Sequence, residues 1–275
     1  MKLTMHSIQH RSSIGVFDSG FGGLTVLKEL VALNPDADYL YFGDTARLPY
    51  GSKSVETVAR YAVEATHFLE QQGASLLVIA CNTATALALD HITASARVPV
   101  VGVVEPGAEQ ATAATRNRKV VVIGTEATVS SHAYLKALEA RGIKAREKAC
   151  PLFVPLVEEG WVEHSVTEQV AQIYLKEAFS DGFHDADVLV LGCTHYPLLQ
   201  TLLRRVAPPH VRIVDSAHST ANVVSRQIGE SMRSQSTAPT RLRFFATDSV
   251  DKFRRLGPRF LGHPVDQVEH VDLKE

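Results

Sequence analysis

The stretch VLVLGCTHYP (188–197) is an apolar run that stops at a cysteine followed by hydrogen-bonding side chains. The stretch LLVIACNT (76–83) repeats this order: apolar residues, a small residue, a cysteine, then polar residues. At the spacing that separates Cys81 from Cys193, the run VVGVVE (100–105) is also matched by RIVDSA (212–217). This internal echo predicts two similar lobes, each of which presents one cysteine.

Seven short runs in the chain are apolar throughout, which is typical of strands that are covered on both faces. Segments of helical period lie between them, such as 24–34, 54–73 and a helix that begins at Thr128 and runs to Arg141. The predicted strands are 14–17, 39–42, 76–79, 100–103, 120–123, 188–191 and 211–214. This alternation predicts an α/β fold in which each lobe is a mostly parallel sheet flanked by helices.

The order of the elements also predicts how the chain is divided. Residues 1–104 and 216–275 are expected to form the first lobe, which carries Cys81, and residues 105–215 the second, which carries Cys193. After a polar loop at 231–240, a strand at 241–248 and a helix at 249–256 are expected to complete the first lobe. The active site is then expected between the two lobes.

Composition narrows the class of protein. The 275 residues are 45% hydrophobic and 21% charged, as in an ordinary globular protein. A formal charge of -2 without a block of Lys or Arg argues against nucleic-acid or anionic-lipid partners, so a small-molecule ligand is expected. The opening MKLTMHSIQHRSS has no apolar signal-peptide core, and no run is long enough to span a membrane. The expected location is the cytoplasm.

The three cysteines, Cys81, Cys150 and Cys193, have no C-x-x-C spacing, so we predict free thiols and not a disulfide framework or a zinc ribbon. Cys150 lacks the shared pattern and is interpreted as a small buried hydrophobe. Cys81 and Cys193 each precede an expected helix, whose free amide protons would lower a thiol pKa from about 8.5. This placement favours a chemical role for both.

Other polar residues follow the strands, where parallel α/β sheets bind ligands. Asp18 ends the first strand, and Ser19 is equally suited to capping the next helix. The turn SGFGG (19–23) fits no nucleotide-binding motif, and we predict that it brings backbone close to a ligand without a nucleotide cofactor. His195 can exchange protons with a thiol or an amine. A zinc site made by Cys81, Cys193 and His195 is the weaker reading, because no fourth ligand has typical spacing.

Several motifs in order make the chain resemble the bacterial glutamate racemases over nearly its whole length. They are DSGFGGLTVL (18–27), LPYGSKS (48–54), VIACNTAT (78–85), VEPG (104–107), CPLFVPLVEEG (150–160) and LGCTHYPLL (191–199). The resemblance implies a cofactor-independent isomerase that interconverts L- and D-glutamate and supplies D-glutamate for peptidoglycan. It implies no metal and no cofactor. The oligomeric state stays open, with a homodimer as one expectation.

The resemblance also implies roles for individual residues. Cys81 and Cys193 would be the two catalytic acid/bases, with Asp18 assisting Cys81. His195 and a glutamate matching Glu158 would assist Cys193, although the adjacent Glu159 fits the motif equally well. The residues expected to bind substrate are Asp18, Ser19, Pro49, Tyr50, Gly51, Asn82, Thr83, Thr125, Thr194 and His195.

Two thiols suit this chemistry because inversion at Cα needs one group to remove a proton and another to deliver one to the opposite face. In a closed complex the sulfur atoms would be about 7 Å apart, too far for a disulfide. Rival readings remain: a racemase of another acidic amino acid such as aspartate, a zinc hydrolase, or a non-catalytic protein that clamps a small acid. A decarboxylase of similar fold is disfavoured because it needs only one cysteine.

Overall fold

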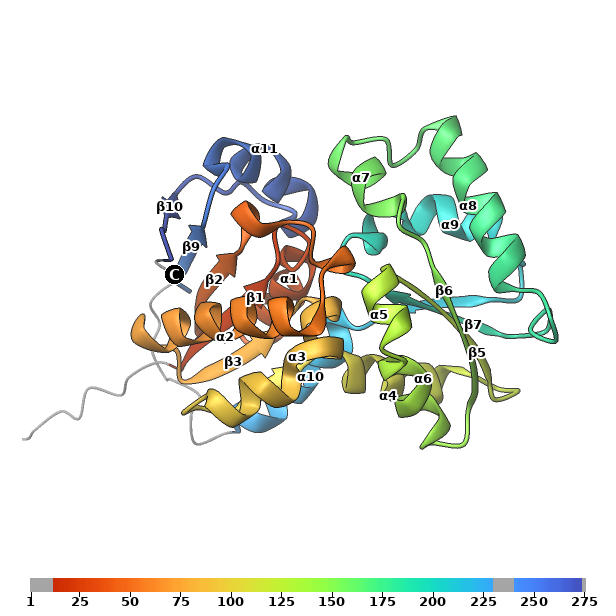
Figure 1. The fold of residues 1–275 in the computed structure, drawn as a ribbon, viewed down its shortest axis with the longest axis horizontal. Coiled ribbons are helices and arrows are strands. Elements are labelled where there is room, and N and C mark those ends of the chain that lie inside the picture. The colour runs from red at the N-terminus through yellow and green to blue at the C-terminus, as the bar shows by residue number, and fades with distance from the viewer. Residues whose placement is uncertain (1–11, 230–239, 274–275) are drawn as a thin grey trace, which may run out of the picture.

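The computed structural model describes residues 12–229 and 240–273 and forms two lobes side by side, each built on one sheet (Figure 1). The expected polar leader and most of the loop at 231–240 lie outside the described residues. Helices cover both faces of each sheet, so the predicted α/β fold class is confirmed.

Sheet A has the strand order β10-β9-β2-β1-β3-β4, and sheet B has the order β6-β5-β7-β8. Every pairing is parallel. The strands of sheet A are β1 (Ser13–Asp18), β2 (Asp38–Gly43), β3 (Leu76–Ile79), β4 (Val100–Gly102), β9 (Leu242–Ala246) and β10 (Val268–His270). Those of sheet B are β5 (Lys119–Gly124), β6 (Lys144–Ala149), β7 (Val188–Gly192) and β8 (Arg212–Asp215).

The two sheets share one arrangement. The order β6-β5-β7-β8 in sheet B repeats β2-β1-β3-β4 in sheet A, and β9 and β10 extend sheet A beyond β2. Strands β3 and β7 are therefore equivalent, and they carry Cys81 and Cys193 beyond their carboxyl ends. The internal echo in the sequence thus reflects two lobes of related topology.

Lobe A is sheet A with the helices packed on it. Alternation along the strands sends Val16 and Val78 toward one layer of helices, and Phe17 and Ile79 toward the other. The first layer is α1 (Leu24–Leu33), α10 (Ala217–Ile228) and α11 (Val250–Leu261), and the second is α2 (Val55–Gln71) and α3 (Asn82–Ser95).

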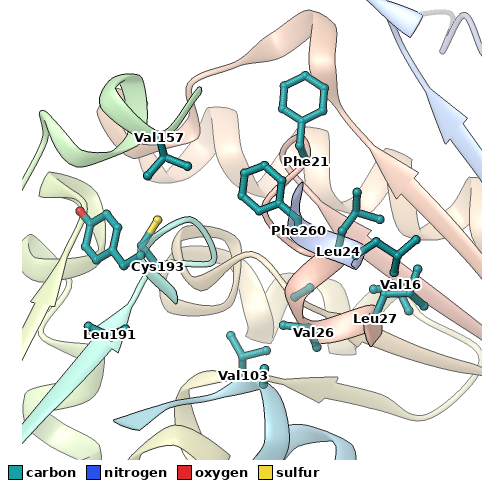
Figure 2. Packing of buried hydrophobic residues seen from close by; sticks show 14 of the residues in the cluster. Val16, Phe21, Leu24, Val26, Leu27, Val103, Val157, Leu191, Cys193 and Phe260 are labelled. Atoms are coloured by element: carbon teal, nitrogen blue, oxygen red, sulfur yellow. The ribbon is translucent and has the colours of Figure 1, made fainter. Parts of the chain in front are cut away.

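Lobe B is sheet B with its helices. Val120 and Val188 pack with α4 (Val104–Ala114) and α6 (Ala133–Glu139), whereas Val121 and Leu189 face α8 (Ser165–Ala178) and α9 (Gln200–Val206). One apolar cluster continues from lobe A into lobe B (Figure 2). The lobes are therefore joined by shared core packing as well as by the chain crossings.

The chain crosses between the lobes at α4 and α10. Helix α10 follows β8 of sheet B but packs on both α1 and α4, and α11 packs on α1. The boundaries predicted at residues 104/105 and 215/216 stay a prediction, because these two helices lie along the junction. Within the described residues, no helix is both long and apolar enough to cross a membrane.

Local signals explain the well-predicted helices. In α2, the Ser54 side chain accepts a hydrogen bond from the Thr57 amide, and Gly73 follows the helix with φ +96°, a conformation that favours glycine. Helix α1 ends at Leu33, and its C-cap Asn34 is followed by Pro35, as the sequence predicts.

Two expectations about lobe B need correction. The helix predicted from Thr128 to Arg141 is two helices, α5 (Glu126–Ser130) and α6, separated at His132 by a left-handed backbone of φ 55°. The cap of α5 is Thr125, whose side chain accepts from the Thr128 amide. Strand β6 was missed because its sequence KAREKA is charged, a composition that suits the edge of a sheet.

Candidate active site

A cavity of about 500 Å³ opens between the lobes at the carboxyl ends of the strands, where parallel sheets bind ligands. Both cysteines that follow equivalent strands line it. The lining consists of Ser19, Thr45, Leu48, Pro49, Tyr50, Gly51, Ser52, Cys81, Asn82, Thr83, Thr125, Glu126, Pro151, Val154, Pro155, Glu158, Cys193, Thr194, His195 and Lys252. A more open hollow of about 1000 Å³ lies along the β8 edge, but it contains neither cysteine, so the smaller cavity is the candidate site.

Cys81 is the N-cap residue of α3. Its sulfur accepts a hydrogen bond from the Ala84 amide at 3.4 Å and lies 3.5 Å from the Ser19 hydroxyl oxygen. The thiol is buried, with 5% of the residue exposed. The strand end and the helix start together fix the sulfur at the cavity wall.

The pKa of Cys81 is raised and not lowered, contrary to the prediction, although the Ala84 amide does act in the predicted direction. Burial and the nearby Asp18 carboxylate raise the pKa to about 12, and they outweigh the opposing effect of the contacts with Ala84 and Ser19. Desolvation disfavours the thiolate more than one helix terminus can stabilise it. Cys81 is therefore a thiol at neutral pH.

Asp18 lies behind the cavity and does not line it. It is fully buried, and its carboxylate accepts hydrogen bonds from the Gly20 amide at 2.9 Å and the Thr194 hydroxyl at 3.4 Å. Burial raises its pKa, while the charge of His195 acts in the opposite direction. Asp18 can therefore affect the site through its neighbours Cys81, Thr194 and His195. Of the adjacent pair Asp18 and Ser19, only Ser19 lines the cavity and can contact a ligand directly.

The second cysteine has a different setting. No α-helix starts at Cys193: its carbonyl accepts from the Tyr196 amide in a turn, and a 3₁₀ helix, η3 (Tyr196–Leu199), precedes α9. The expected helix start at this thiol is thus wrong, because Pro197 and the turn displace it by several residues. The prominent neighbour of Cys193 is instead His195.

His195 links Cys193 to Glu158. Its Nε2 atom lies 3.4 Å from Glu158 Oε1, within ion-pair distance but without forming a hydrogen bond. Burial lowers the pKa of His195, but Cys193 and Glu158 outweigh burial and raise it to about 10. His195 is therefore a positively charged imidazolium at neutral pH, and it lies beside Cys193.

The geometry distinguishes the two adjacent glutamates. Glu158, at the end of α7 (Phe153–Glu158), faces the cavity, whereas Glu159 is exposed. Burial alone would raise the pKa of Glu158, but His195 and Lys252 hold it below its usual value. Glu158 is thus an ionised carboxylate between two cationic groups.

Polar groups from both lobes form one wall of the cavity. The Thr83 hydroxyl of lobe A lies 2.9 Å from the Thr125 hydroxyl of lobe B, and Thr125 lies 2.9 Å from the Thr128 hydroxyl. Nearby, the Tyr134 hydroxyl donates to Asn82 Oδ1 at 2.7 Å. These bonds bring hydroxyls and amides together at the start of α3, where anions bind favourably.

The loop after β2 supplies another wall. Pro49, Tyr50 and Gly51 line the cavity, and the Tyr50 hydroxyl donates to the buried Asp44 carboxylate. A Cβ atom on Gly51 would lie 2.8 Å from Thr125 Cβ, so a larger residue there would push the lobes apart. Glycine at this position permits the close approach of the loop to lobe B.

The turn 19–23 behaves differently from expectation. Ser19 lines the cavity, but the glycines of the turn do not. A Cβ atom on Gly22 would lie 2.2 Å from Thr194 Oγ1 and 2.5 Å from His195 Nδ1. The close backbone approach predicted for this turn therefore serves packing against lobe B and not contact with a ligand.

Every predicted site residue except Asp18 lines the cavity. Cys150 is fully buried in the apolar cluster, and none of the three cysteines forms a disulfide. Sequence reasoning missed Lys252 of α11, which lines the cavity and donates to Glu158 Oε2 at 2.7 Å. Nothing in the run DKFRRL (251–256) separates this lysine from its exposed neighbours, so only the fold could find it.

Comparisons with known proteins agree with this geometry. The family model described as Asp/Glu/Hydantoin racemase matches residues 14–224. A glutamate racemase from Koribacter versatilis is 61% identical, with 96% of this chain and 99% of that protein covered. A glutamate racemase from Geobacter metallireducens is 47% identical, with 95% and 97% covered.

Solved structures give the same result. Francisella tularensis glutamate racemase in complex with D-glutamate has a TM-score of 0.88 at 34% identity, covering 96% of this chain and 98% of that one. The Thermus thermophilus glutamate racemase in complex with β-chloro-D-alanine has a TM-score of 0.85 at 44% identity, with the same coverage. This chain therefore belongs to the Asp/Glu/hydantoin racemase family.

Proposed function

We propose that this chain is an isomerase that interconverts L- and D-glutamate, with Cys81 and Cys193 as the two acid/bases. The observation that carries the proposal is that the cysteines after the equivalent strands β3 and β7 line one cavity from different lobes. Two proton-transfer groups contributed by opposing lobes are what inversion at a single carbon requires.

The two halves of the site surround their thiols with different groups, and the reaction needs an acid and a base at once. Cys81 carries its proton because burial and Asp18 raise its pKa to about 12. His195 and Cys193 are in direct contact, so the imidazole can exchange a proton with this thiol. In the substrate complex, Cys193 removes the Cα proton that points toward it, and Cys81 protonates the opposite face. The roles exchange for the other enantiomer.

The cavity wall suits a substrate with two carboxylates. As the Cα proton leaves, negative charge spreads onto the α-carboxylate, and donors fixed at that position lower the barrier. The amides at the start of α3, near Asn82 and Thr83, and the hydroxyls of Ser19, Thr125 and Thr194 are available for this purpose. Both carboxylates can be bound by neutral donors in a partly buried site.

The chemistry of these residues needs no added cofactor: the thiols move the protons, and the fixed donors stabilise the charge. Glutamate is the substrate we assign because the similar proteins from Koribacter versatilis and Geobacter metallireducens are glutamate racemases. A Picrophilus torridus aspartate racemase, 16% identical, shares the fold alone. The biological product is D-glutamate for peptidoglycan synthesis, made in the cytoplasm.

The deciding experiment is incubation of the purified protein with L-glutamate in heavy water without added cofactor. We expect optical rotation to fall to zero while one solvent deuteron enters Cα of each inverted molecule. A parallel sample with L-aspartate tests the other acidic substrate, and preference for aspartate would contradict the substrate assignment. Binding of glutamate without Cα exchange would identify the non-catalytic clamp.

A further inference from the structure

Helix α11 reaches from lobe A to the acid/base groups of lobe B. Its residue Lys252 donates to Glu158 Oε2 at 2.7 Å. The Phe260 ring packs edge-on against the His195 ring, with centroids 5.3 Å apart. A Cβ atom on Gly160, just beyond α7, would lie 2.4 Å from Arg259 of α11. One helix thus contacts Glu158, His195 and the segment that carries Glu158.

Helix α11 belongs to lobe A, which carries Cys81. These contacts nevertheless place it beside the residues that surround Cys193. Figure 1 shows α11 and α7 facing each other across the two lobes, and Figure 2 shows Phe260 in the apolar cluster that also contains Cys193. Lys252 lies 5.5 Å from the centre of the Phe21 ring, so its ammonium is held from the lobe A side as well.

Among the described residues that line the cavity, Lys252 is the only lysine or arginine. Its ammonium is bound to one oxygen of Glu158, and the other oxygen of the same carboxylate faces His195 Nε2 at 3.4 Å. The Glu158 side chain is 14% exposed, so this carboxylate is largely removed from water and depends on its neighbours for its orientation.

We propose that Lys252 is a positioning residue for proton transfer at Cys193, acting through Glu158 and His195 and not by contact with the reacting carbon. The inference rests on the proposed racemase function. Without the ammonium, the Glu158 carboxylate loses a charged partner and its fixed direction, and the imidazole loses its aligned counter-charge. Proton transfer is sensitive to such displacements, because a shift of about 1 Å costs roughly a hundredfold in rate.

The test is steady-state racemisation by Lys252→Met. We expect kcat to fall by about tenfold to a hundredfold while KM changes less than about threefold. Lys252→Arg keeps the charge and should recover most of the loss, which a simple packing role would not predict. Arg255→Met is the matched control, since it removes a cation from the exposed face of the same helix and should keep kcat within about twofold.

A double-mutant cycle decides whether Lys252 acts through Glu158. In a Glu158→Gln background, Lys252→Met should reduce kcat by less than about twofold. Equal losses in both backgrounds would overturn the proposal, as would an unchanged kcat in the single variant. A rise in KM alone would show instead that Lys252 binds the substrate carboxylate. Failure of the wild-type protein to racemise glutamate would refute the proposed function, whereas a fully active Lys252→Met refutes only this inference.

Discussion

Cys81 and Cys193 follow equivalent strands, yet the two lobes surround them with different chemistry. Cys81 caps a 14-residue helix and lies near a buried carboxylate that helps to raise its pKa to about 12. Cys193 lies in a turn beside a histidine whose pKa is raised to about 10. The two lobes therefore place a thiol at the same position of a shared topology but surround it with different groups.

This difference suits a reaction that needs an acid and a base at the same moment. Two thiols in identical surroundings would hold a single shared proton on either sulfur equally often. Unequal surroundings favour one of these two arrangements over the other.

The largest loss of activity is expected when either thiol is removed. Cys81→Ala and Cys193→Ala should each reduce racemisation by at least about 10³-fold, because each deletes one of two obligatory proton-transfer groups. The measurement is the rate of change of optical rotation, with circular dichroism to verify folding. Cys150→Ala is the matched control, since Cys150 lies in the core outside the cavity lining and its loss should leave kcat within about twofold. Full activity of either single variant would end the two-thiol account.

Replacing His195 should affect the Cys193 half alone. His195→Gln removes the proton donor beside Cys193 and should lower kcat by about 10²-fold. The pKa of Cys81 should change little, and ultraviolet absorbance of the thiolate in a pH titration measures it. A large change at Cys81 would show that the two halves are not separately tuned.

The corresponding change in the other half is Asp18→Asn. Loss of the carboxylate should lower the pKa of Cys81 from about 12, because the Asp18 charge disfavours the thiolate. The same titration, in a protein whose only remaining cysteine is Cys81, measures the shift. An unchanged titration would show that burial alone sets the state of Cys81.

The pH dependence of stability gives a smaller effect. The folded pKa of His195, about 10, lies above the unfolded value of about 6.5, so its contribution is complete below pH 6.5 and is lost as pH rises toward 10. The free energy of unfolding, measured by urea denaturation from pH 6 to 10, should therefore decline more steeply in the wild type than in His195→Gln. Parallel curves would contradict the assigned charge.

The smallest expected effect concerns a bond between the lobes. Tyr134→Phe removes the hydrogen bond to Asn82 and should cost about 1 kcal/mol of unfolding free energy. Tyr196→Phe removes a comparable bond to the Cys150 carbonyl within lobe B and should cost a similar amount. Only Tyr134→Phe should also change KM, since Asn82 lines the cavity. Equal changes of KM in the two variants would show that the bond between the lobes has no special effect on substrate binding.

Much of this arrangement could be predicted from the sequence because its signals are local. Apolar runs marked most strands of both sheets, though not β6 or β10, and the repeated cysteine pattern marked the equivalent strands β3 and β7. Most residues assigned to the site by family resemblance do line the cavity, and their roles stay predictions.

The parts that could not be predicted depend on contacts between distant segments. The charged strand β6 exists because β5 offers it an edge, and the break at His132 divides a segment of helical period. Asp18 and Ser19 are adjacent, yet only packing decides that one lies behind the cavity and the other lines it. Lys252 donates to Glu158 although 94 residues separate the two along the chain.

The position of β9 has a consequence for synthesis on the ribosome. Strand β9 pairs with β2, although about two hundred residues separate them in the chain. Sheet B can finish pairing once residue 215 has emerged, whereas the β2 edge of sheet A stays open until residues 242–246 follow. An open edge invites association with other chains. Nascent protein stalled between these two points should therefore be the species most dependent on chaperones.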